Sequence, residues 1–156
     1  METILDERGE FYGLVSGPDA SSLTLPADWP SFVCLIWDSA GTYSAHARLT
    51  LSRKLIAAGC RYAVCGGLKC EAWQDSLDEA YAELGRDFEE TDGRFVMTTW
   101  HRDKWPNEVA FFFVHCTDCE DNRFSDHLVL HLGSNAGLES ELKRSVIRHA
   151  LSRESS

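Results

Sequence analysis

The amino-acid sequence predicts an α/β fold, a three-layer α/β/α sandwich around a four-stranded, mostly parallel β-sheet. Four short apolar segments rich in β-forming residues begin at about residues 32, 61, 95 and 127. Their spacing of about 30 residues is the length of a strand, a helix and two loops. The intervening segments keep the apolar spacing of amphipathic helices, which can cover both faces of such a sheet.

The four predicted strands differ in how clearly the sequence marks them. The segment 32–37 is apolar at every position and is followed by a turn at 38–42, as expected for a strand buried on both faces. The segments 62–65, 95–100 and 127–132 are shorter or mixed, but each lies between helical patterns. Because parallel strands require long crossover connections, this alternation favours a parallel sheet.

Two predicted helices end at a glycine. They cover 44–58 and 70–84, and Gly59 and Gly85 suit the left-handed position that follows a helix. A final helix is expected after Gly137, with Leu142 among its buried residues.

The segment 106–116 is ambiguous, because its run of Val, Ala and Phe residues would also suit a strand. Pro106 is favourable in the first turn of a helix, and Glu108 suits the positive end of the helix dipole. The need for a crossover between two parallel strands points the same way, so a helix is predicted.

The chain of 156 residues, 44% hydrophobic and 26% charged, has the size and composition of one globular domain. We expect that domain to cover residues 31–152. Residues 1–30 are expected to form an N-terminal extension that packs on the core, in which the apolar patch 11–15 could add an edge strand. Residues 153–156 are expected to be a disordered tail.

Charge and cysteine content limit the classes of partner and compartment. Twenty-five acidic against fifteen basic residues give a formal charge of -10, which repels nucleic-acid phosphates and favours a basic protein partner, although acidity can also serve solubility alone. No apolar run is long enough to cross a membrane, and no signal peptide is evident at the N-terminus, so a cytoplasmic location is expected. The six cysteines are therefore interpreted as thiols.

Short motifs within 59–66, 71–80 and 98–101 resemble a family of small bacterial proteins described only as a domain of unknown function. They include Gly59-Cys-Arg-Tyr62, Glu71-Ala-Trp-Gln-Asp75 and Thr98-Thr-Trp-His101, and the resemblance covers residues 32–115. The resemblance implies a Rossmann-like (flavodoxin-like) α/β fold. It implies no activity, substrate or catalytic residue.

A pocket is expected at the carboxyl ends of the parallel strands, where ligands bind in open α/β sheets. Its expected lining is Ser39, Cys65, Gly66, Gly67, Glu71, Thr98 and Thr99. The glycine pair could expose N–H groups to a phosphate, but it matches no nucleotide-binding motif, and a tight strand-to-helix turn is the simpler interpretation.

Three residues near this pocket are candidate catalytic groups. Cys70 lies at a predicted helix start, which lowers a thiol pKa, and His101 and Asp38 could serve as its base and acid. The alternative is structural: Cys70 packs or caps the helix, and His101 is a turn residue. No local motif of a cysteine enzyme is present.

A metal site is also considered and not favoured. Cys116 and Cys119, with His115 beside them, have the spacing of half a zinc site, with Cys60 and His127 as possible further ligands. No metal and no cofactor are expected.

Two functional hypotheses remain. The first is a non-catalytic, acidic protein-binding module, in one form an immunity or antitoxin-like protein that neutralises a basic partner. Its expected binding residues are Asp75, Asp78, Glu79, Glu83, Glu89, Glu90 and Trp105. The alternative is a small enzyme or nucleotide-ligand sensor with a Cys/His/Asp site at the carboxyl ends of the strands.

Overall fold

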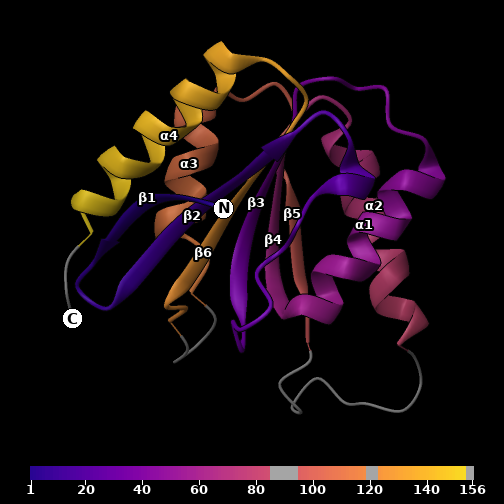
Figure 1. Ribbon diagram of the computed structural model, residues 1–156, viewed down its shortest axis with the longest axis horizontal. Coiled ribbons are helices and arrows are strands. Elements are labelled where there is room, and N and C mark those ends of the chain that lie inside the picture. The colour runs from indigo at the N-terminus through magenta and orange to yellow at the C-terminus, as the bar shows by residue number, and fades with distance from the viewer. Residues whose placement is uncertain (85–94, 119–122, 154–156) are drawn as a thin grey trace.

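The computed structural model describes residues 1–84, 95–118 and 123–153, and it has helices on both faces of one sheet (Figure 1). The strands in these ranges are β1 (Glu2–Glu7), β2 (Glu10–Gly17), β3 (Phe32–Asp38), β4 (Cys60–Gly67), β5 (Met97–Trp100) and β6 (Asp126–Leu132). The helices are α1 (Ala45–Ala58), α2 (Cys70–Glu83), α3 (Pro106–His115) and α4 (Ala136–Leu151), with a short 3-10 turn, η1 (Ala20–Ser22).

The sheet is mixed and has six strands in the order β1-β2-β6-β3-β4-β5. The prediction of an α/β fold is confirmed, but the prediction of four strands is wrong. The two additional strands form an antiparallel hairpin, and β2 also pairs in parallel with β6. Arg8 and Gly9 make the hairpin turn, with φ of 58° and 75°. The first strand is exposed and polar because it forms the sheet edge, so it lacks the apolar pattern that marks the inner strands.

The crossover connections divide the helices between the two faces, as Figure 1 shows. Helix α1 connects β3 to β4, and α2 connects β4 to β5, both on one face of the sheet. Helix α3, which connects β5 to β6, and α4, which follows β6, lie on the other face. The neighbouring strands β3 and β6 are thus followed by helices on opposite faces. This is the topological switch point, outside which ligands bind in doubly wound folds.

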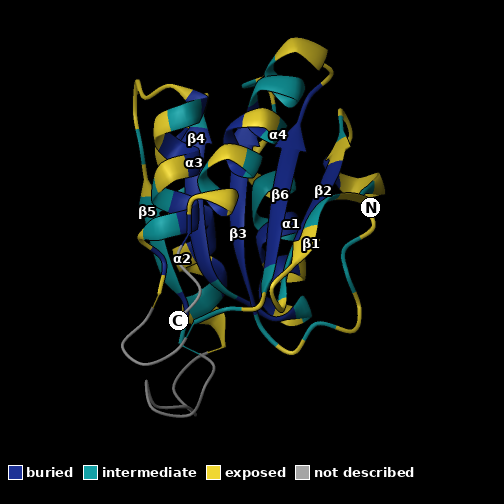
Figure 2. Cartoon of the chain, turned by 90° about the vertical axis from the view of Figure 1, so that its left-hand side faces the viewer, coloured by how far each residue is buried: buried dark blue, intermediate teal, exposed yellow. Residues whose placement is uncertain are grey.

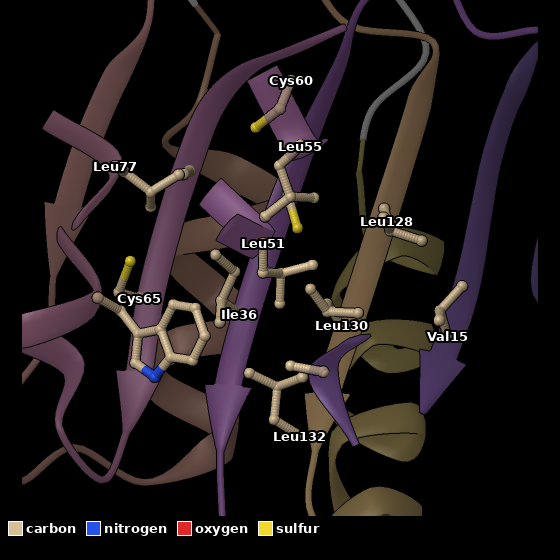
Figure 3. Close-up of a cluster of buried hydrophobic side chains, with 14 of the residues drawn as sticks. Val15, Ile36, Leu51, Leu55, Cys60, Cys65, Leu77, Leu128, Leu130 and Leu132 are labelled. Atoms are coloured by element: carbon tan, nitrogen blue, oxygen red, sulfur yellow. The ribbon is translucent and has the colours of Figure 1, made fainter. Parts of the chain in front are cut away.

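The buried core lies on both sides of the sheet. Every residue of β3 is buried, and Figure 2 shows the buried sheet between helices whose outer surfaces are exposed. The cluster on the α1/α2 face includes Ile36, Leu51 and Leu130, which are labelled in Figure 3. The cluster on the α3/α4 face includes Leu35 and Phe113. The alternation of side chains along each strand therefore decides which helix layer a residue meets.

The predicted helix over 106–116 is confirmed as α3. Pro106 occupies the first turn, and the Glu108 carboxylate accepts a hydrogen bond from the Trp105 backbone N–H at 2.9 Å. Phe113 and Val114 are fully buried, whereas Phe111 is half exposed. The apolar residues of α3 therefore pack against the sheet from one side of the helix. None of the helices in the described ranges combines the length and apolarity needed to cross a bilayer.

Candidate functional site

Asp38, a candidate catalytic acid, accepts three hydrogen bonds from the protein. Its side chain lies at the end of β3 and the residue is 1% exposed. One carboxylate oxygen accepts the backbone N–H groups of Ala40 and Gly41 at 2.8 and 2.7 Å. The other accepts the indole N–H of Trp73 at 2.9 Å. This carboxylate therefore holds the turn after β3 against helix α2.

The glycines at the end of β4 are required by close contacts. A Cβ on Gly67 would lie 2.5 Å from the Asp38 carbonyl oxygen, and Gly67 has a φ of +76°. Leu68 then donates its backbone N–H to the same oxygen at 2.8 Å. The pair thus forms a tight passage from strand to helix, in which one carbonyl of β3 fixes the turn.

The two buried cysteines near this turn face the α1/α2 layer. Cys70 is the first residue of α2 and is 4% exposed, and Cys65 is fully buried in the same cluster. Burial raises the pKa of the Cys65 thiol well above its ordinary value. Both cysteines therefore pack as core residues.

His101 lies on the opposite face of the sheet from these cysteines. Its ring packs against Phe112 of α3, with ring centroids 4.5 Å apart, and its Nε2 lies 3.0 Å from the Thr99 hydroxyl. Partial burial, followed by the charge of Lys104, lowers its pKa. Within the described residues, no hydrogen bond joins it with Cys70 or Asp38. The structure therefore does not bring the three candidate catalytic groups together.

A hollow of about 480 Å³ opens beside the start of α2. It is lined by residues of the β4–α2 turn, the first turns of α2 and the loop after β5, which are Gly67, Leu68, Lys69, Cys70, Glu71, Ala72, Asp75, Arg102 and Asp103. An ion pair between Arg102 and Glu71 spans it, and the Arg102 guanidinium lies 5.4 Å from the centroid of the Trp100 ring. Leu68, which lines the hollow, is 53% exposed, and Trp100, which lies under Arg102, is 40% exposed.

The acidic residues expected to bind a partner fall into two groups. Asp78 accepts a hydrogen bond from the Thr98 hydroxyl at 2.7 Å, and Glu83 forms a bidentate ion pair with Arg53 at 2.8 and 2.7 Å. In the part of the chain that the structure describes, Asp75 and Glu79 have no hydrogen-bond or ion-pair partner. Glu89 and Glu90 lie outside the described residues. Trp105, the expected aromatic contact, is 72% exposed.

A polar row at the centre of the carboxyl edge was not anticipated as a unit. His131 of β6 is 1% exposed and lies between two serines. Its Nδ1 is 3.0 Å from the Ser16 hydroxyl, and its Nε2 is 3.0 Å from the Ser39 hydroxyl. Ser16 is on β2, and the pairing of β2 with β6 could not be predicted from the sequence. No local sequence motif therefore indicates this row.

A second hollow, of about 210 Å³, lies at the amino end of the sheet beside the β1–β2 turn. Its charged groups are largely paired with one another: Glu10 accepts from Arg123 at 2.6 Å, and Arg153 forms a bidentate pair with Asp118 at 2.8 and 2.9 Å. Burial and the nearby Glu10 raise the pKa of Tyr12 to about 12. Arg153 also lies 3.6 Å from Glu10 and accepts a hydrogen bond from Arg8 at its carbonyl oxygen, so the chain just after α4 is fastened to the hairpin.

The described cysteines, including Cys116, are free thiols, and Cys119 lies outside the described residues. Across residues 1–84, 95–118 and 123–153, no group of three or more His, Cys, Asp or Glu side chains is arranged to hold a metal ion. His127 is committed elsewhere, because its ring stacks on Tyr12 with centroids 4.0 Å apart and its Nδ1 lies 3.1 Å from the Phe11 carbonyl oxygen.

Comparison with known proteins gives the chain a family. No curated protein matches the sequence. A family described as "Domain of unknown function (DUF7684)" matches residues 13–149, a range that begins in β2 and ends in α4 and so includes every strand except β1. Since this match covers most of the chain, the protein belongs to the DUF7684 family.

Proposed function

We propose that this protein is a protein-binding module that holds a basic protein partner at the corner formed by α2 and the loop after β5. In its most concrete form it is an immunity or antitoxin-like protein that neutralises a basic effector in the bacterial cytoplasm. The observation that carries the proposal is the hollow at the start of α2, where Asp75 and Asp103 are without ion-pair partners among the described residues and Leu68 is exposed beside them.

The chemistry of this corner suits an arginine or lysine side chain. The chain already holds one guanidinium there, since Arg102 lies over Trp100 and pairs with Glu71. The remaining carboxylates offer the same recognition to a cation from outside, and the exposed Leu68 and Trp100 supply apolar area that can be buried on contact. The formal charge of -10 adds long-range attraction to a basic partner.

The free thiols of the described cysteines fit a reducing compartment, which supports the cytoplasmic location. The Cys/His/Asp enzyme hypothesis has weaker support, because Cys70 and His101 face opposite helix layers.

The first experiment identifies the partner at this corner. A photo-crosslinking amino acid at Leu68 is expected to capture a basic protein in cells of the source organism. The same amino acid at Leu151, which is similarly exposed at the far end of α4, is the control. Capture from both positions alike would contradict a docking site at the α2 corner.

The second experiment measures the electrostatics with the captured partner. The double variant Asp75→Asn/Asp103→Asn is expected to lower the association rate about tenfold at low salt, because steering charges next to the contact are removed. The variant Asp6→Asn/Asp28→Asn removes the same charge from distant exposed sites and should change the rate by less than about twofold. Equal effects of the two variants, or an association rate insensitive to salt, would refute the proposal.

A further inference from the structure

The row Ser16–His131–Ser39 lies at the switch point between β3 and β6, away from the α2 corner, and its hydrogen bonds have a definite direction. The Ser39 hydroxyl donates to the Leu132 carbonyl oxygen at 2.9 Å. Its single hydrogen is thereby used, so towards His131 the Ser39 oxygen can only accept. Nε2 of His131 must then carry the proton.

This tautomer determines what happens on the other side of the ring. A neutral imidazole protonated at Nε2 has an unprotonated Nδ1, which can only accept. The group 3.0 Å from Nδ1 is the Ser16 hydroxyl, so Ser16 donates its hydrogen to His131. Ser16 is exposed, whereas His131 is buried. The row thus consists of an exposed hydroxyl, a buried base and a second hydroxyl that fixes the tautomer of the base.

We propose that Ser16 is a nucleophile activated by His131, with Ser39 as the positioning residue, and that it reacts with uncharged esters by acyl transfer. The arrangement has the relations of a serine nucleophile, its general base and an orienting third group. Its place at the carboxyl ends of β2, β3 and β6, at the switch point, is where this class of fold binds ligands.

Three further observations fit this assignment. A Cβ on residue 133 would lie 2.2 Å from the Ser39 oxygen, so Gly133 leaves the space in which Ser39 reaches the ring. The Glu139 carboxylate of α4 lies 4.0 Å from Nδ1, where it stabilises the imidazolium that forms when Ser16 gives up its proton. Asp38 of β3 acts on His131 in the same direction. These two carboxylates, with the net charge of the chain, disfavour an anionic substrate.

The reaction is balanced without a cofactor. The Ser16 oxygen forms a bond to the ester carbonyl carbon while its proton passes to Nδ1 of His131. The bond from that carbon to the alcohol oxygen then breaks, and His131 returns the proton to the departing alkoxide. Water, deprotonated by the same base, hydrolyses the acyl group from Ser16 and restores the hydroxyl.

The test is covalent labelling with an uncharged alkyl fluorophosphonate, followed by peptide mapping, together with hydrolysis of p-nitrophenyl acetate. Ser16 of the wild-type protein is expected to be labelled at least ~100-fold faster than Ser134, an exposed serine at the same edge that has no hydrogen-bond partner among the described residues. Ser16→Ala and His131→Gln should abolish the labelling and the hydrolysis. Mapping in the wild-type protein decides the question even where a variant fails to fold.

The pH profile separates activation from mere exposure. The labelling rate should rise as His131 loses its proton, with a midpoint below 6.5 because burial lowers its pKa. Glu139→Gln should move the midpoint lower still, since the Glu139 charge raises that pKa. Ser39→Ala should slow labelling, and Ser39→Thr, which keeps the hydroxyl, should restore it. Labelling of Ser39, equal labelling of Ser16 and Ser134, or a rate independent of pH would overturn the proposal.

Discussion

Two regions at the carboxyl end of the sheet differ in whether their carboxylates have hydrogen-bond partners within the protein. At the centre, Asp38 is 1% exposed, and both of its carboxylate oxygens accept hydrogen bonds from the protein. At the α2 corner, Asp75 and Asp103 border a hollow with no ion-pair partner among the described residues. For these carboxylates, internal pairing rather than residue type decides whether the side chain serves the fold or is available to a partner.

The largest expected effect is at the centre. Asp38→Ala removes one acceptor from three N–H donors, including the fully buried indole of Trp73. A donor that stays buried without an acceptor destabilises the folded protein by its full desolvation free energy. The free energy of unfolding should therefore fall by about 4 kcal/mol, as measured by urea titration. A loss below about 1 kcal/mol would mean that water replaces the carboxylate and that the centre is no better paired than the corner.

The second-largest expected effect is the pH dependence of stability caused by the buried His127, whose Nδ1 lies beside a backbone carbonyl oxygen. Burial lowers its pKa from 6.5 to about 4. Between these pH values the unfolded chain binds a proton and the folded chain does not, so stability falls as the pH is lowered. The loss between pH 7 and pH 4 should be about 3 kcal/mol.

This contribution is measured as the difference between wild type and His127→Gln in urea titrations at pH 7 and pH 4. The other titrating groups act alike in both proteins and cancel. An equal loss on acidification in both would show that His127 is protonated in the folded state.

The smallest expected effect is at the corner. Asp75→Asn and Asp103→Asn, singly or together, should change the free energy of unfolding by less than about 0.5 kcal/mol, because neither carboxylate has an internal partner to lose. Thermal or urea unfolding checks this. A cost approaching that of Asp38→Ala would place these residues in the fold and remove the distinction between the two regions.

The sequence predicted most of the elements because burial leaves a clear mark on composition. The strand β3 is covered on both faces and is therefore continuously apolar, and Pro106 correctly identified the start of α3 in a segment with strand-like composition. The strand β1 was missed for the opposite reason, whereas the patch 11–15, considered as an edge strand, lies in the inner strand β2. The edge strand β1, Glu2–Glu7, has an exposed or half-exposed residue at every position and so has no apolar pattern to read.

The sequence did not predict which of the candidate site residues are neighbours in the fold. Trp100, the last residue of β5, lies under Arg102, which pairs with Glu71 of α2, whereas the next residue, His101, packs against Phe112 of α3. This alternation is enough to separate His101 from Cys70. The contact of Ser16 with His131 could not be predicted, because it depends on the register of β2 against β6. Strand order is a property of the whole chain and has no local signal.

The pairing of β2 with β6 has a consequence for the order in which the protein folds. Ser16 and His131 are neighbours in space but 115 positions apart in sequence. During synthesis the hairpin emerges well before β6, its permanent neighbour in the sheet. The β3–β4–β5 half can assemble from nearby segments, whereas joining the hairpin to β6 closes the longest loop between paired strands of the described residues, which makes that step the expected kinetic bottleneck.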